Sequence, residues 1–387
     1  MGNYLNPGNE NFRKMVNSEI YIDKTGMLEY TNRSIGTMQG FLCVSRPRRF
    51  GKSMAAAMLA AYYSRECDSK ELFSAFEIAG SKDFDKYLNK YDTIFLNMQE
   101  FLSQSRDMDG MLDLIRRSVL WDLLQKYPDY RYFDNSNLTR TMQDVYAGSK
   151  IPFVIIIDEW DCIFREYKMD KEAQEQYLDF LRDLIKDKGY IHLAYMTGIL
   201  PIKKYGTHSA LNMFDEFTMI NPGPLASYVG FTETEVRNLC EKYEIGMEEV
   251  KNWYDGYSFE TEPSVYSPRS VVSCMRFGRI GNYWNQTETF EALQVYIDMN
   301  FDGLRDDVLS MIAGERVPVN TGSFTNDMAT FRTEYDVLTL LIHLGYLGYD
   351  NVNKCVFIPN SEVLAEYVNA VSVSDWGEIS KALKNSA

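Results

Sequence analysis

Short apolar runs recur between residues 41 and 220, and stretches long enough for helices separate them. Apolar runs of four to eight residues are typical of buried strands. The predicted strands are Phe41–Ser45 and residues 93–98, 152–157, 191–197 and 217–220. The predicted helices between them include Lys52–Tyr63, Met108–Lys126 and residues 172–186. Strands that alternate with helices predict an α/β fold, in which helices cover both faces of a parallel sheet.

From about Leu225 the pattern becomes mostly helical. Residues 230–243 predict a Thr-capped helix with acidic residues in its first turn, and another helix begins at Glu248. Residues 335–344 predict an amphipathic helix closed by Gly345, and two strands around an Asp-Asn turn follow it. We therefore expect an N-terminal segment (1–30), an α/β core (31–224), a helical lid-like domain (225–334) and a small winged-helix-like C-terminal region (335–387).

Composition supports a folded chain of more than one domain. The 387 residues are 45% hydrophobic and 14% aromatic, which is enough apolar material for packed cores. The net charge of −15 disfavours a global attraction to nucleic acids or to anionic membranes. Six widely spaced cysteines and three histidines disfavour a zinc ribbon or a disulfide framework. Without a signal peptide or an apolar run long enough to span a bilayer, we expect a cytoplasmic protein.

The segment 45–53, SRPRRFGKS, ends in the Gly-Lys-Ser of a phosphate-binding loop, between a predicted strand and a predicted helix. Backbone N–H groups at the helix start would face phosphates, Lys52 would neutralise the β- and γ-phosphates, and Ser53 would bind Mg²⁺. Arg46 occupies the first glycine position of the motif, where positive φ is hard for Arg. The expected nucleotide contacts are Arg46, Arg48, Arg49, Phe50, Gly51, Lys52, Ser53 and Met54. By itself, this segment is equally compatible with an ordinary helix N-terminus after a turn.

Two carboxylates follow the most apolar predicted strand. A buried parallel strand delivers its C-terminal side chain to the sheet edge where ligands bind, so Asp158 is a candidate Mg²⁺ ligand. Glu159 is a candidate for polarising the attacking water. The alternative, in which one of the pair only caps the next helix, is less favoured because both motifs belong to one predicted sheet. Thr197, at the end of another strand, either contacts the γ-phosphate or the water, or satisfies a local turn.

Other polar groups near these motifs allow two interpretations each. Arg48 and Arg49 could contact phosphates or remain solvated. Lys203, Lys204 and His208 could reach a neighbouring nucleotide, although a solvated loop is the favoured interpretation. Asp23 is a candidate N-cap for a helix over residues 26–30.

Taken in order, seven motifs resemble the AAA-ATPase-like family of predicted P-loop ATPases, which often carry a C-terminal PD-(D/E)XK nuclease-like domain. They are YIDKT (21–25), SRPRRFGKS (45–53), IIIDEWD (155–161), MTGI (196–199), SALNMFDEFTM (209–219), WYDGYSF (253–259) and VYSPRSV (265–271). The resemblance implies an ASCE-type ATPase, with Lys52 and Ser53 as Walker A residues and Asp158 and Glu159 as the Walker B pair. It makes Arg46 a family trait, and Trp160 stands where the family has Tyr.

The resemblance also implies a nuclease-like continuation after Val363, for which residues 364–387 are too few. We therefore predict no nuclease activity in this chain. The favoured function is a Mg²⁺-dependent ATPase whose nucleotide state rearranges the lid and C-terminal regions. The alternatives are a nucleotide-gated binding or signalling module with negligible turnover, and a truncated remnant of an ATPase–nuclease fusion. Expected partners are ATP and either a protein or a nuclease-like domain in trans. DNA is disfavoured by charge, no membrane is expected, and an oligomer is compatible with the sequence.

Overall fold

The computed structural model describes residues 2–202, 211–284, 290–299, 301, 303–325 and 331–373. They form two compact units. The first unit comprises the chain up to Ser45 and Lys52–Phe217, and the second comprises Arg46–Gly51 and the described residues from Thr218 onward. The four-part division expected from the sequence stays a prediction.

The first unit is built on a sheet of five parallel strands in the order β2-β3-β4-β1-β5. Its strands are β1 (Phe41–Ser45), β2 (Asp92–Asn97), β3 (Phe153–Asp158), β4 (Ile191–Gly198) and β5 (Asp215–Phe217). Every residue of β3 is buried, as expected of a central strand with helices over both faces. This sheet confirms the predicted α/β fold of the P-loop NTPase class.

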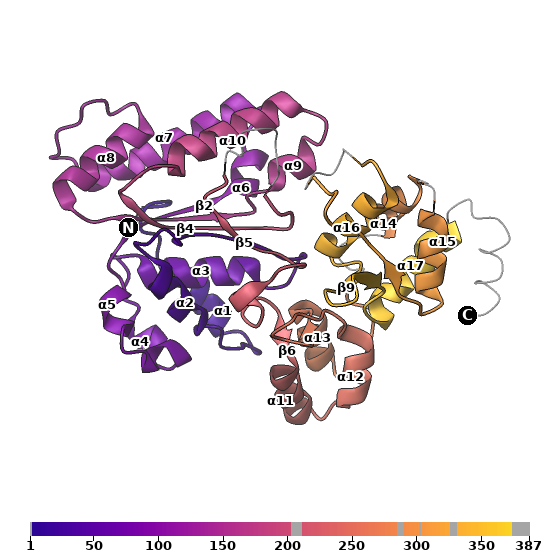
Figure 1. The fold of residues 1–387 in the computed structure, drawn as a ribbon. Helices are drawn as coiled ribbons and strands as arrows, with labels where there is room; N and C mark the ends of the chain where they lie inside the picture. The colour runs from indigo at the N-terminus through magenta and orange to yellow at the C-terminus, as the bar shows by residue number, and fades with distance from the viewer. Residues whose placement is uncertain are drawn as a thin grey trace. The chain divides into compact units, whose positions relative to one another are not determined.

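Helices cover both faces of this sheet (Figure 1). On one face lie α1 (Glu10–Val16), α2 (Met27–Ser34) and α3 (Lys52–Tyr63), and on the other lie α7 (Met108–Lys126), α8 (Leu138–Ser149) and α10 (Lys171–Ile185). Shorter helices in this unit are α4 (Lys70–Phe73), η1 (Glu77–Gly80), α5 (Phe84–Tyr87), α6 (Met98–Ser103) and α9 (Cys162–Glu166). The long helices start where the sequence offers caps: Asp107, Asn137 and Asp170 each accept a hydrogen bond from a first-turn backbone N–H.

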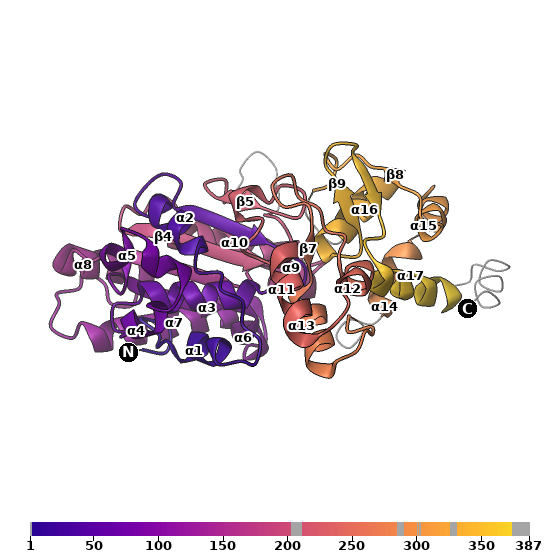
Figure 2. The same ribbon diagram turned by 90° about the horizontal axis from the view of Figure 1, so that it is seen from below.

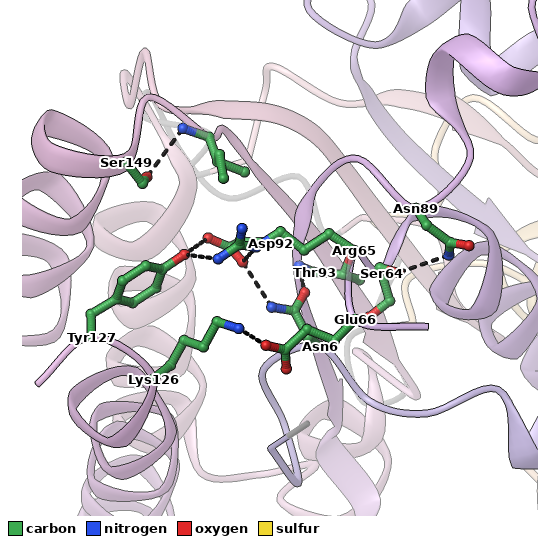
Figure 3. A network of polar contacts seen from close by, with 11 residues as sticks. Asn6, Ser64, Arg65, Glu66, Asn89, Asp92, Thr93, Lys126, Tyr127 and Ser149 are labelled. Atoms are coloured by element: carbon green, nitrogen blue, oxygen red, sulfur yellow. Dashed lines mark hydrogen bonds and ion pairs between the residues drawn. The ribbon is translucent and has the colours of Figure 1, made fainter. Parts of the chain in front are cut away.

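The N-terminal segment covers the free edge of β2. Leu5 forms an antiparallel bridge with Ile94, and the amide of Phe95 donates to the carbonyl of Tyr4 at 2.9 Å. The side chain of Asn6 donates to Asp92 and accepts from the amide of Thr93, as the close-up in Figure 3 shows. These contacts satisfy backbone groups that an open sheet edge would leave exposed.

Two local predictions are corrected by the first unit. Helix α2 has Gly26 at its N-cap position, and Asp23 instead accepts from the amides of Thr25 and Glu77, each at 2.8 Å. The strand expected over residues 217–220 ends at Phe217. The side-chain oxygen of Thr218 accepts hydrogen bonds from two following amides, and this turn removes those residues from the sheet.

The second unit combines helices with two small antiparallel sheets. Its first part contains η2 (Gly223–Leu225), the β6–β7 pair (Phe231–Thr232, Val265–Tyr266), α11 (Glu233–Tyr243), α12 (Met247–Tyr254) and α13 (Pro268–Phe277), which gather together in Figure 2. Its second part contains α14 (Phe290–Ile297), α15 (Leu304–Ile312), α16 (Glu334–Leu344), α17 (Ser361–Val373) and the sheet β8-β10-β9 (Val317–Pro318, Cys355–Phe357, Gly348–Asp350).

Several sequence predictions are confirmed in this unit. Thr232 and Glu235 form a reciprocal capping box at the start of α11. Gly345 closes α16 with φ of +86°, a conformation that favours glycine. The hairpin turn between β9 and β10 is held by Asp350, which accepts from the amides of Val352 and Asn353. In the described part of the chain, no helix has the length and apolarity needed to cross a membrane.

Candidate functional site

The carboxyl ends of four parallel strands meet at one edge of the sheet. In the pairing register, Asp158 lies between Asn97 on β2 and Thr197 on β4, and Ser45 at the end of β1 lies opposite Gly198. The strand register therefore brings Asp158 and Thr197 side by side. Helix α3 begins at Lys52, a few residues after the end of β1. The first unit thus gathers polar groups from several strands at the edge where parallel α/β sheets bind ligands.

Asp158 is almost fully buried at the end of β3. Burial raises the pKa of its carboxyl from 3.8 to about 6, and the neighbouring charge of Glu159 adds to this rise. A hydrogen bond with the Ser53 side chain and the charge of Lys52 act in the opposite direction. The two predicted metal-binding oxygens, those of Ser53 and Asp158, are therefore in direct contact.

Lys52 is also buried, at 4% exposure. Burial lowers the pKa of its ammonium group, and the charges of Glu159, Asp161 and Asp158 oppose this shift. A buried ammonium group costs free energy unless negative charge lies close to it. Here three carboxylates supply that charge. The ammonium group of Lys52 is therefore stabilised by carboxylates of its own unit.

Glu159 has a backbone conformation that is uncommon for its residue type, with φ of +56°. Its carboxylate forms an ion pair with the guanidinium of Arg165 on α9. Burial alone would lower the pKa of Arg165, but the charges of Asp161 and Glu159 raise it overall. The predicted water-polarising residue is therefore held by a cation that the sequence analysis did not single out.

Asp161 connects this pair to the end of β4. Its side chain is fully buried, and one carboxylate oxygen accepts from the amides of Ile199 and Leu200 at 3.0 and 2.9 Å. The same oxygen lies 3.5 Å from Nε of Arg165. A Cβ atom at Gly198 would lie 2.6 Å from the other oxygen of Asp161, so the backbone must approach closely here.

Thr197 carries a buried hydroxyl that has no hydrogen-bond partner within the described ranges. Buried hydroxyl groups are normally hydrogen-bonded, and exceptions are concentrated at functional sites. Its carbonyl accepts from the amide of Trp160 at 3.0 Å, so the backbone of Thr197 is engaged while its side chain is available. The predicted contact of Thr197 with the γ-phosphate or the attacking water stays a prediction, and an available hydroxyl is compatible with it.

Residues 46–51 pack within the second unit, and their side chains divide into two classes. Arg46 and Phe50 are buried, whereas Arg48 and Arg49 are exposed. The guanidinium of Arg46 lies 5.1 Å from the ring centroid of Phe259, and Phe50 makes an edge contact with a second aromatic ring, that of Tyr257, at 5.3 Å. Both aromatic partners belong to the WYDGYSF motif.

The backbone of this loop also explains how an Arg replaces the first glycine of the motif. Positive φ occurs at Arg49 (+68°) and Gly51 (+93°), and Arg46 does not adopt it. Of the remaining predicted contacts, Met54 lies on α3 and is 39% exposed. Lys203, Lys204 and His208 lie outside the described residues.

A family model described as AAA-ATPase-like, "Predicted AAA-ATPase", matches residues 7–207, more than half of the chain. The chain belongs to this family. The match covers strands β1 to β4 of the parallel sheet, the Gly-Lys-Ser segment and the Asp158–Glu159 pair. The resemblance stated from the sequence motifs is therefore confirmed.

Among curated proteins, this AAA-ATPase-like chain is similar to the "uncharacterized protein in vnfD 5′ region" of Azotobacter chroococcum mcd 1. The two are 24% identical over 281 residues, which are 70% of this chain and 51% of the relative. The matched region thus spans about half the length of that relative.

Among solved structures, the Walker-type ATPase PABY2304 of Pyrococcus abyssi is 12% identical at a TM-score of 0.46, over 89% of this chain and 94% of that one. The ORC2 protein of Aeropyrum pernix is 14% identical at a TM-score of 0.36, over 92% and 96%.

Three residues near the Gly-Lys-Ser segment and the Asp158–Glu159 pair of this AAA-ATPase-like protein were missed by sequence reasoning. Asp161 and Arg165 are four residues apart, a spacing that places two side chains on one face of a helix. That spacing was a usable signal, but it is common on solvated helices. Asn97 is brought beside Asp158 by the strand register, and its side chain caps α6 by accepting from the amide of Glu100. Only the pairing of β2 with β3 reveals its position.

Proposed function

We propose that this chain binds ATP with Mg²⁺ and hydrolyses it, as a member of a family of predicted AAA-ATPases. The observation that carries the proposal is the contact between Ser53 and Asp158 beside the buried Lys52. Mg²⁺ prefers oxygen ligands, and in nucleotide sites it is held by one or two protein oxygens together with phosphates and water. The side chains of Ser53 and Asp158 fit that requirement.

Each residue then has a defined task. Backbone N–H groups at the start of α3 and the charge of Lys52 bind the β- and γ-phosphates. Bound Mg²⁺ supplies charge neutralisation at the phosphoryl group. Glu159 accepts a hydrogen bond from the attacking water, and the hydroxyl of Thr197 contacts the γ-phosphate or that water.

Nucleotide binding and phosphate release in three variants test this proposal. Lys52→Ala is expected to weaken ATP binding by more than about tenfold, because it removes a buried cation. Glu159→Gln is expected to bind ATP like wild type and to hydrolyse it about 10²-fold more slowly. Lys171→Ala is the matched control, because Lys171 is also the first residue of a helix but is exposed. Equal ATP affinity in wild type and Lys52→Ala would contradict the proposal.

We also propose that nucleotide state rearranges the second unit. Support comes from the packing of Arg46 and Phe50 beside Phe259 and Tyr257, because a loop that shifts on binding phosphate disturbs these contacts. Trypsin cleavage at the exposed Arg48 and Arg49, with and without ATP, should differ in rate. Unchanged cleavage throughout the chain, under conditions where ATP is bound, would argue against the rearrangement.

The alternative is a nucleotide-gated binding module with negligible turnover. It shares the ATP site and differs only in the chemical step, so phosphate release no faster in wild type than in Glu159→Gln would favour it. Salt-sensitive binding of DNA would then distinguish a nucleic-acid partner from a protein partner. The net charge of −15 favours the protein.

A further inference from the structure

We infer that Arg165 is a positioning residue for the proposed hydrolysis: it fixes the Glu159 carboxylate at the sheet edge, and Asp161 in turn holds Arg165. This inference rests on the proposed function, because it concerns the group that polarises the attacking water. It goes beyond the Walker-type motifs, since Arg165 lies on α9 outside both of them.

The ion pair between Arg165 and Glu159 is shielded from solvent. The Arg165 side chain is 9% exposed and the Glu159 side chain is 23% exposed. Ion pairs between exposed side chains contribute little, because water and salt screen them. A pair with this degree of burial is stronger and has fewer alternative geometries.

Arg165 also has a second carboxylate, that of Asp161, within ion-pair distance. Its Nε lies 3.5 Å from the carboxylate of Asp161, which is fully buried and bound to the amides of Ile199 and Leu200. A continuous set of contacts therefore runs from the backbone after β4, through Asp161 and Arg165, to Glu159. Rigid support of this kind determines whether a catalytic group stays within a fraction of an ångström of its working position.

The charges around Glu159 explain why support is needed. The carboxylates of Asp158 and Asp161 and the ammonium of Lys52 share this small region with Arg165. The charge of Glu159 also acts on Lys52, so without Arg165 we expect Glu159 to compete with phosphate for the Lys52 ammonium group. Arg165 gives Glu159 a cationic partner other than Lys52, the residue proposed to bind the phosphates. The ion pair within the described residues is made by Oε2 of Glu159, and we assign the other oxygen, Oε1, to the attacking water.

The test compares Arg165→Met, Arg165→Lys, Glu159→Gln and the Glu159→Gln/Arg165→Met double variant in the full chain. Arg165→Met is expected to lower kcat by about 10–100-fold, with the Kd for ATP within about threefold of wild type. Arg165→Lys should recover part of the loss, because it keeps the charge but not the planar guanidinium. Arg182→Met, which removes an exposed pair with Asp179, is the control and should leave kcat unchanged.

The double variant separates positioning from a general structural role. If Arg165 acts through Glu159, then Arg165→Met has no further effect on kcat in the Glu159→Gln background. Melting temperatures without nucleotide give an independent readout: each single variant should melt below wild type, and the double variant should melt no lower than the less stable single variant. An equal loss of kcat in both backgrounds, or additive losses in melting temperature, would overturn the inference.

The outcomes also distinguish this inference from the proposed function. Wild type that releases no phosphate overturns both. Hydrolysis that is lost in Glu159→Gln but unaffected by Arg165→Met supports the proposed function and overturns the inference alone. Loss of ATP binding in Arg165→Met, parallel to the loss of kcat, also overturns it, because that result places Arg165 in the binding of ATP.

Discussion

Two buried aspartates, Asp92 and Asp158, lie on neighbouring parallel strands of the same sheet, at opposite ends of the strands. Asp92 is the first residue of β2 and Asp158 is the last residue of β3. Figure 3 shows Asp92 among Asn6, Arg65 and Tyr127, which all donate hydrogen bonds to its carboxylate. Its two oxygens are thus bound by a cation, an amide and a phenol.

Asp158 has weaker support within its unit. It accepts from the amide of Glu159 at 3.1 Å and contacts Ser53, and burial raises its pKa to about 6. A nearby threonine hydroxyl, that of Thr197, has no hydrogen-bond partner within the described ranges. The comparison teaches that equal burial of a carboxylate serves two purposes. Where the partners are complete, burial stabilises the fold, and where they are weaker, it leaves a carboxylate with a raised pKa, a property that is common at functional sites.

Substitution of Asp92 should have the largest effect on stability. Asp92→Ala leaves the buried or half-buried donors of Asn6, Arg65 and Tyr127 without their acceptor. Removing one member of a buried ion pair costs about 3–5 kcal/mol. We therefore expect a loss of about this size in the free energy of unfolding, measured by urea denaturation of the full chain. A loss below about 1 kcal/mol would show that the network is not a source of stability.

Gly198→Ala should have the next largest effect, because it crowds the opposite edge of the sheet. A Cβ there would lie 2.6 Å from an oxygen of Asp161 and 2.7 Å from the indole of Trp160, and both side chains are fully buried. Overpacking of this kind costs about 2–3 kcal/mol. Gly189→Ala is the control, because no atom lies within 4 Å of its Cβ position. Equal stability of the two variants would mean that the Asp161 region repacks freely.

The strands and helices around these two aspartates could be predicted from the sequence, because they depend on local patterns of residues. The apolar run before Asp158 and the helix Met108–Lys126 were predicted correctly, because continuous burial and an N-cap at Asp107 are visible in the sequence. The roles of Lys52 and Ser53 were inferred from a motif and stay predictions. The network around Asp92 was not predicted, because it joins residues up to 121 positions apart in sequence, from Asn6 to Tyr127.

Burial of charged side chains was the property that the sequence could not supply. Arg46 was expected to contact phosphates, and that role stays a prediction, although its side chain is buried beside Phe259. Arg165 was not singled out from the sequence, because an Asp four residues before an Arg is usual on solvated helices. Whether an arginine is exposed or buried depends on tertiary packing, which one sequence does not reveal.

Asp158→Asn should change the free energy of unfolding less than Asp92→Ala or Gly198→Ala, and it should stabilise the protein. The folded-state pKa of about 6 exceeds the ordinary 3.8, so the folded protein binds this proton more tightly. The contribution of Asp158 to stability is therefore full below about pH 4 and is lost as pH rises to about 6. Asn removes this dependence. The rise of about two pKa units corresponds to about 3 kcal/mol at pH 7. Because Asn accepts weaker hydrogen bonds than a carboxylate, we expect the variant without nucleotide to be about 1 kcal/mol more stable than wild type at pH 7, and no more stable at pH 4.

Unfolding in urea at the two pH values measures this effect. Asp129→Asn is the control, since Asp129 is exposed and should show no such pH-dependent gain. A variant less stable than wild type at pH 7 would show that the neighbours of Asp158 fully compensate its ionised carboxylate. Asp92 and Asp158 would then not differ in how well their neighbours support a buried carboxylate.

The smallest change in stability is expected for the exposed ion pair between Arg117 and Asp113. Its distance equals that of the buried Arg65–Asp92 pair. Both the Arg65–Asp92 and the Arg117–Asp113 pairs have an Nε–O distance of 2.7 Å. The side chains of the second pair are 68% and 59% exposed, against 24% and 0% in the first. Screening by water limits an exposed pair on a helix to about 0.3–0.5 kcal/mol. We expect Arg117→Ala to change the free energy of unfolding by no more than this, and the change should vanish in high salt. If it matched the cost of Arg65→Ala, distance and not burial would determine the strength of these pairs.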